Sequence, residues 1–116
     1  MENKPHDLKT RTKAFARRII HLYTSLPEQT VAQVLGKQLL RSGTSVGANY
    51  REANRGRSKA EFISKMGDCL RELEETEYWM ELLMDEGIVR PRKAASLLGE
   101  TRELIAIFIT IINNAK

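Results

Sequence analysis

The sequence predicts an all-α fold, an antiparallel four-helix bundle in which residues 1–116 form a single domain. Apolar residues recur every three or four positions along four successive segments, which is the period of helices that each bury one side. Turn and capping residues separate the segments. The run IAIFITII near the C-terminus is rich in β-branched residues. Because the chain offers this run no partner strand, we predict a helix there as well.

The first helix is predicted over residues 7–25, where apolar residues share one face at about 100° per residue. That face consists of Leu8, Phe15, Ile19, Leu22, Tyr23 and Leu26. Another face carries residues spaced by four, namely Lys9, Lys13, Arg17 and His21. Pro27 then ends the helix and suits the first position of the next one.

The second helix is predicted over residues 27–55, although its segment LLRSGTSVGANYREA contains six turn-forming residues and locally resembles a loop. Helical spacing nevertheless divides this stretch into three sides. The side expected to face the bundle is Val31, Leu35, Leu39, Ser42, Val46, Asn49 and Ala53. A basic stripe on the far side is Lys37, Arg41, Arg51 and Arg55. Gly43 and Gly47 form the third side, where close packing should offset about 1 kcal/mol per glycine.

The third helix is predicted to follow a stop at Gly56, with Ser58 and Glu61 at the spacing of a capping box. Its core face is Phe62, Met66, Cys69, Leu70, Leu73, Met80 and Met84, and Gly87 ends it. An adjoining face is Glu72, Glu75, Trp79 and Leu83. The fourth helix is predicted from Pro91, with a core face of Ala94, Leu97, Leu98, Thr101, Leu104, Ile105, Phe108 and Ile112.

Charge is divided unevenly along the chain. Residues 1–57 hold 11 Lys and Arg against 4 Asp and Glu, whereas residues 58–116 hold 8 against 11. This division indicates either a polyanionic partner or attraction between the two halves. With one cysteine, no signal-peptide pattern and no apolar run of membrane-spanning length, the chain is expected to be cytoplasmic and to have no contact with a membrane.

No set of residues predicts an enzyme, a cofactor or a metal site. Cys69 lies on a core face without a nearby base, which is typical of a buried structural thiol. The glutamates of the third helix are expected to form a solvated face. Glu77 is the exception, because its position near the core calls for a polar or cationic partner.

The basic stripe is the best candidate binding site. Lys37, Arg41, Arg51 and Arg55, with Arg57 just beyond, could follow the phosphates of RNA or DNA. Four further cations could extend it, namely Lys9, Lys13, Arg17 and Arg18. No aromatic platform for stacked bases accompanies the stripe, so binding would be tolerant of sequence. The alternative is a solvated face that only aids solubility.

Two features suggest contacts between subunits. Gly43 and Gly47 allow close packing either within one bundle or between copies of the chain. Trp79, together with Leu82, Leu83, Ile107 and Ile111, adds more apolar surface than a single four-helix core needs. This set could cover the edge of the core, but we favour an oligomer interface.

The segments LLRSGTSVGANYREA and RSKAEFISKMGDCLRELEETEYWMELL resemble the small bacterial proteins associated with intervening sequences of 23S ribosomal RNA. The resemblance implies an up-down-up-down four-helix bundle, commonly a ring-shaped homopentamer, and brings no catalytic residue. The chain is also similar to accessory proteins of diversity-generating retroelements, which are basic pentameric barrels that bind nucleic acid and a reverse transcriptase. That similarity implies an alternative role as a scaffold or accessory subunit of such an enzyme.

Residues of two helices carry the family resemblance. The matching positions are Arg41, Ser42, Ser45, Gly47, Asn49, Glu52, Ala53, Phe62, Leu70, Glu74 and Glu77.

Overall fold

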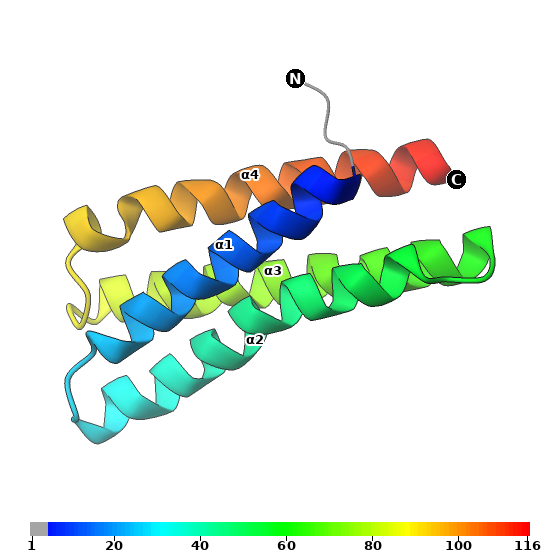
Figure 1. The fold of residues 1–116 in the computed structure, drawn as a ribbon. Helices are drawn as coiled ribbons and strands as arrows, with labels where there is room; N and C mark the ends of the chain where they lie inside the picture. The colour runs from blue at the N-terminus through cyan, green and yellow to red at the C-terminus, as the bar shows by residue number, and fades with distance from the viewer. Residues whose placement is uncertain (1–4) are drawn as a thin grey trace.

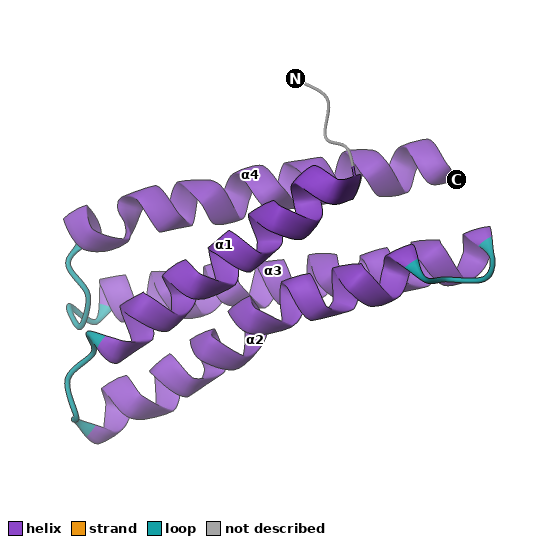
Figure 2. Cartoon of the chain, in the orientation of Figure 1, coloured by secondary structure: helices purple, strands orange, loops and turns teal. Residues whose placement is uncertain are grey.

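A computed structural model describes residues 5–116, with side chains described from Asp7 onward. It contains four helices, α1 (Pro5–Thr24), α2 (Thr30–Asn54), α3 (Lys59–Asp85) and α4 (Pro91–Ala115). Each helix runs antiparallel to the one before it, as Figure 1 shows. The prediction of an all-α, up-down-up-down bundle is therefore confirmed. Short connections join the helices into an elongated body with extents of 45 × 26 × 20 Å (Figure 2).

The start of α2 differs from the prediction, because this helix begins at Thr30 and not at Pro27. Leu26 turns back into the core, where it is buried against the position of Gly36. The chain reverses direction after Leu26, and the residues that make this turn are therefore not part of α2. The Pro27 carbonyl instead accepts a hydrogen bond from the Gln33 side chain at 3.0 Å.

The other two connections keep the expected helix cap and the stop at Gly87, but Gly56 does not adopt the left-handed conformation expected after α2, since only Gly87 has a positive φ among the described glycines. The Ser58 hydroxyl accepts the backbone N–H of Glu61 at 3.0 Å, so the predicted cap of α3 is confirmed. The Glu61 carboxylate in turn accepts the backbone N–H of Arg57 at 3.0 Å. After α3, Gly87 adopts a φ of 70°, a left-handed conformation that glycine tolerates, and Val89 then returns to the core.

The core draws on all four helices and contains the large side chains of Phe15, Leu39, Met66 and Phe108. Phe108 meets Tyr50 edge to face, with ring centroids 5.8 Å apart. No helix in the described part of the chain is long and apolar enough to cross a membrane.

A buried polar contact joins α2 to α3. The Thr76 and Ser42 hydroxyls are hydrogen-bonded to each other at 2.9 Å, and both side chains are fully buried. Thr76 also bonds the Glu72 carbonyl at 2.8 Å, while Ser42 lies within reach of the Leu39 carbonyl at 3.3 Å. The hydroxyls are thus satisfied where an unpaired polar group would destabilise the core. The expectation that Ser42 faces the bundle is confirmed.

The buried side of α2 differs from the expected face, because Val31 does not face the bundle and the glycine side is buried as well. Val31 is 55% exposed, whereas Gly36, Gly43 and Gly47 are buried. A Cβ atom at Gly43 would lie 2.7 Å from Ile19 Cγ1, and one at Gly47 would lie 3.2 Å from Thr12 Oγ1. The glycine side therefore packs against α1 of the same chain. This corrects the assignment of Gly43 and Gly47 to an oligomer interface, because α1 already covers them.

The close approach of α1 and α2 predicts opposite effects for alanine at two glycines. Gly43→Ala should lower the free energy of unfolding by about 1–3 kcal/mol, because the new methyl group collides with buried Ile19. Gly67→Ala in α3 is the matched control, since no atom lies within 4 Å of its added Cβ. It should raise stability by about 0.5–1 kcal/mol through helix propensity. Urea unfolding followed by circular dichroism measures both, and equal effects would contradict the close approach.

Candidate nucleic-acid interface

The basic stripe of α2 lies on the exposed side of the helix, but its members have different surroundings. Lys37, Arg51 and Arg55 are exposed and form no ion pair with any residue that the structure describes. Arg41 instead bridges to α3, with Nη1 3.3 Å from Glu72 and Nη2 2.6 Å from Glu75. Arg41 is therefore partly neutralised by its own chain and is a weaker candidate for phosphate binding than the others.

The packing of α1 on α2 determines which cations of the two helices lie at the same level. Thr12 lies against Gly47, and the helices are antiparallel, so Lys9 lies level with Arg51. Lys37 is 14 residues from Arg51, or about 20 Å along the helix axis. The structure thus concentrates free cations toward the end where α2 meets α3. We refer to Lys9, Lys13, Arg51, Arg55 and Arg57 as the α1–α2 basic surface.

Arg18 belongs to a different side of α1 from Lys9 and Lys13. Its Nη2 donates to the Ser96 hydroxyl of α4 at 2.9 Å. Arg17 is exposed and lies about 100° around the helix from Arg18. The four cations of α1 therefore do not extend the α2 stripe as one patch, which corrects the expectation for Arg18.

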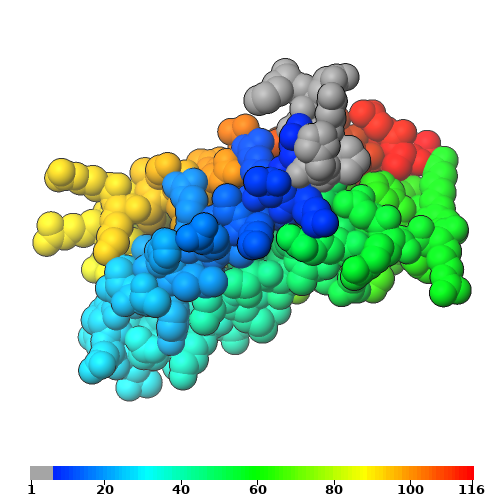
Figure 3. Space-filling view, in the orientation of Figure 1, coloured from blue at the N-terminus to red at the C-terminus, as the bar shows by residue number. Residues whose placement is uncertain are grey.

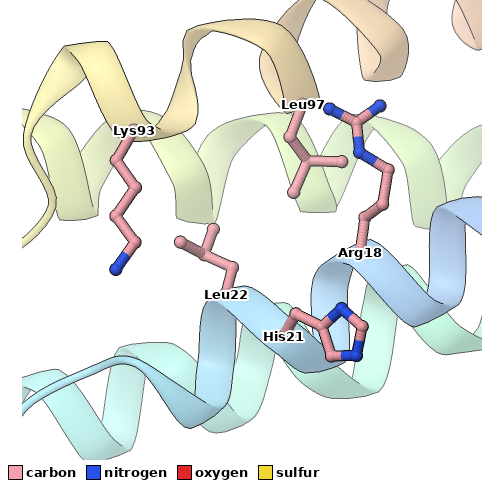
Figure 4. A pocket seen from close by; sticks show the side chains of 5 residues that line it. All are labelled: Arg18, His21, Leu22, Lys93 and Leu97. Carbon is pink, nitrogen blue, oxygen red and sulfur yellow. The ribbon is translucent and has the colours of Figure 1, made fainter.

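Arg18 contributes to a hollow between α1 and α4 that sequence reasoning missed. The hollow has a volume of about 290 Å³ and is lined by Arg18, His21, Leu22, Lys93 and Leu97 (Figure 4). Nearby, side chains project from the α3–α4 connection and the start of α4 at one end of the molecule (Figure 3). One signal was present in the sequence: Arg90, Arg92 and Lys93 surround Pro91 at a helix start, where acidic residues are usual.

Most glutamates of α3 are engaged in ion pairs and do not form a simple solvated face. Glu77 accepts Arg102 Nε at 2.7 Å, and Glu81 accepts Arg102 Nη2 at 3.0 Å. The cation expected as one possible partner of Glu77 thus comes from α4. Together with the Arg41 pairs, these contacts account for four of the five glutamates from Glu72 to Glu81, and Glu74 is exposed.

Arg11 connects α1 to α4 by a second set of ion pairs. Its guanidinium donates from Nε and Nη2 to the two carboxylate oxygens of Glu100, each at 2.8 Å, and Nη2 also lies 2.8 Å from Glu103. The hydrogen bonds to Glu100 raise the pKa of Arg11 above its usual value. Some of the cations of residues 1–57 therefore pair with carboxylates of residues 58–116 within the fold.

The residues expected at an oligomer interface lie on two opposite sides of the bundle. Trp79 and Leu82 are half-buried on the side of α3 where Glu72 and Glu75 meet α2. Ile107 and Ile111 are half-buried on the side of α4 that carries Glu103, which meets α1. The indole Nε1 of Trp79 is buried without an acceptor in the part of the chain that the structure describes.

Two features of the described side chains bear on catalytic and metal chemistry. Cys69 is buried, and burial raises the pKa of its thiol to about 12, so the nucleophilic thiolate is disfavoured. Among residues whose side chains are described, no group of three or more His, Cys, Asp or Glu could hold a metal ion. The side chain of His6 lies outside that description.

Comparisons with known proteins identify similar chains. Residues 5–110 match the family model described as 23S rRNA-intervening sequence protein. A similar crystal structure is that of a protein with unknown function from the S23 ribosomal protein family of Bacteroides thetaiotaomicron VPI-5482. The two chains are 41% identical, with a TM-score of 0.84 over 90% of this chain and 96% of that chain. No curated protein matches the chain.

The buried state of Cys69 predicts a thiol that reacts only after unfolding. We expect Ellman's reagent at about pH 8 to leave the native protein unmodified, because the thiol is both inaccessible and protonated. In guanidinium chloride the same reagent should modify one thiol per chain. Absorbance of the released thionitrobenzoate measures the reaction. Rapid modification of the native protein would contradict the buried, inert assignment.

Proposed function

Because this chain belongs to the 23S rRNA-intervening sequence protein family, we propose that it is a non-enzymatic RNA-binding protein. The observation that carries this proposal is the α1–α2 basic surface. Its five cations come from two packed helices and the connection after α2, and none of their side chains forms an ion pair with a carboxylate of the described chain. Such a surface attracts a polyanion by releasing the counterions that surround its phosphates.

The composition of this surface favours contacts to the RNA backbone over readout of bases. The exposed large aromatic side chain of the described chain is Tyr78, which lies on α3 and packs against Trp79. The α1–α2 basic surface therefore has no aromatic platform for unstacked bases. Phosphate contacts would position an RNA without specifying its sequence, and DNA phosphates offer the same chemistry.

The proposed function includes self-assembly through two different apolar patches. Trp79 and Leu82 lie on the α2–α3 side, whereas Ile107 and Ile111 lie on the opposite, α1–α4 side. Head-to-tail contacts need two such unlike patches, and they close into a ring when the rotation between neighbours allows it. An acceptor from a neighbouring subunit would also satisfy the buried Trp79 N–H.

A homopentameric ring would carry five copies of the α1–α2 basic surface, so that a weak contact between one copy and RNA would be repeated in the others. The α1–α2 side of each subunit would stay free, because the contacts would use the two adjoining sides. A long RNA that reaches several copies of the surface binds the later ones intramolecularly, at a high effective concentration.

Binding to a fluorescently labelled RNA hairpin tests the surface. The double variant Arg51→Gln/Arg55→Gln should lower affinity and reduce the slope of log K against log salt by about 1–2, since it removes two phosphate contacts. Arg41→Gln is a matched control on the same helix and should change both much less, because Glu72 and Glu75 already engage Arg41. Fluorescence anisotropy across a salt series measures both quantities. An unchanged affinity and slope in the double variant would exclude this surface as the site.

Mixing two assembly variants tests the head-to-tail arrangement. Trp79→Glu and Ile107→Glu should each block assembly, because each places a charge in one patch. A mixture of the two should form heterodimers, since each variant keeps the patch that the other lacks. Light scattering measures the masses, and circular dichroism checks that both variants stay helical. A monomeric wild type, or a mixture that stays monomeric, would contradict the arrangement.

A further inference from the structure

The hollow between α1 and α4 differs in kind from the α1–α2 basic surface, because it is concave and has an apolar floor. Leu22 and Leu97 form that floor, and Arg18 and Lys93 stand at its sides (Figure 4). The two cations come from different helices: Arg18 reaches from α1 toward α4, and Lys93 reaches from α4 toward α1. Only the packing of the two helices brings them to one site.

The charges around this hollow are all of one sign. The charged side chains that line it are the cations Arg18 and Lys93, and no carboxylate belongs to its described lining. Arg18 is held in place by its hydrogen bond to Ser96, at 2.9 Å. A guanidinium has five N–H donors, so most of those on Arg18 remain available to a ligand. An anion at the edge of the hollow would find the hydrogen-bond donors of Arg18 on one side and of Lys93 on the other.

The site continues past Lys93 into a neighbouring hollow of about 240 Å³. Its lining includes Leu26, Val89 and Arg90 together with Lys93. The two hollows share Lys93, so positive charge alternates with apolar surface along the line where α1 faces the start of α4. Leu97 is ten residues from Ile107, or about 15 Å along α4, so the proposed subunit contact is not required to cover this site.

The shape and lining together indicate the ligand. A volume of about 290 Å³ exceeds what a phosphate group occupies, and apolar floors contribute nothing to the binding of a bare anion. A base-paired nucleotide hides the faces of its base, whereas an unpaired nucleotide presents a flat apolar face and a phosphate together. We propose that this hollow binds one unpaired nucleotide, with the base over Leu22 and Leu97 and the phosphate attracted to the cations that flank them, Arg18 and Lys93. The assignment of this nucleotide to an RNA strand rests on the proposed function.

Titration of the isotopically labelled protein with uridine 5′-monophosphate tests the site without a polynucleotide. The amide resonances of residues around Leu22 and Leu97 should shift, and the nucleotide should bind more tightly than inorganic phosphate or uridine alone. Arg18→Gln and Lys93→Gln should each weaken binding by about tenfold, because each removes a charged hydrogen-bond donor. Arg17→Gln and Arg92→Gln are the matched controls. They remove the same charge one residue away, outside the lining of the hollow, and should leave binding unchanged.

Two results of the titration would contradict the proposal. Equal affinity for phosphate and for the nucleotide would overturn the nucleotide assignment, because the floor would then contribute nothing. Shifts that are absent from the hollow, or that persist in Arg18→Gln and Lys93→Gln, would overturn the site itself. The labelled hairpin separates this proposal from the earlier one. A hairpin bound through Arg51 and Arg55 without nucleotide binding at Arg18 would refute only the hollow, and the reverse result would refute only the α1–α2 basic surface.

Discussion

The close approach of α1 to α2 is the constraint on which the rest of the structure depends. It requires positions on α2 without a side chain, and Gly36, Gly43 and Gly47 provide them under Tyr23, Ile19 and Thr12. Because α1 packs more extensively on α2 than on α4, the line where α1 faces α4 holds polar contacts and hollows more than apolar packing. Both candidate binding sites follow from this placement of α1.

Electrostatics within the bundle decides which cations remain available. Arg11, Arg41 and Arg102 each join two helices through a pair of glutamates, so their charges serve the fold. A single exposed ion pair of this kind contributes little to stability. The main effect of these pairs is that three arginines are not available to a ligand. Among the cations that remain available are those of the α1–α2 basic surface and those around the α1–α4 hollow. The two places differ in shape, which is why a backbone contact suits the first and an enclosed nucleotide suits the second.

Membership of the 23S rRNA-intervening sequence protein family makes RNA a natural partner to consider, and the arrangement of charge supplies the physical reason for the proposal. The related protein from Bacteroides thetaiotaomicron has unknown function. The similarity to retroelement accessory proteins stays a prediction. In the proposed ring, a bundle with apolar patches on two opposite sides and free cations on a third would present repeated basic surfaces.

The sequence by itself determined the number and kind of the elements, because a helix that buries one side leaves a period of three and four residues wherever it occurs. The period prevailed over the loop-like composition of residues 39–53, and the core side chains of α4 were assigned from it almost completely. Local chemistry likewise identified the capped start of α3 at Ser58.

Only the tertiary structure decided which side of each helix meets which neighbour. The glycine side of α2 turned out to be covered by α1, Arg41 to be engaged by Glu72 and Glu75, and Arg18 to lie across from Lys93. A helical period is a local pattern, so it indicates which side of a helix is buried but not which neighbouring helix covers that side. These pairings join residues that are far apart in the chain, so their positions depend on the packing of whole helices.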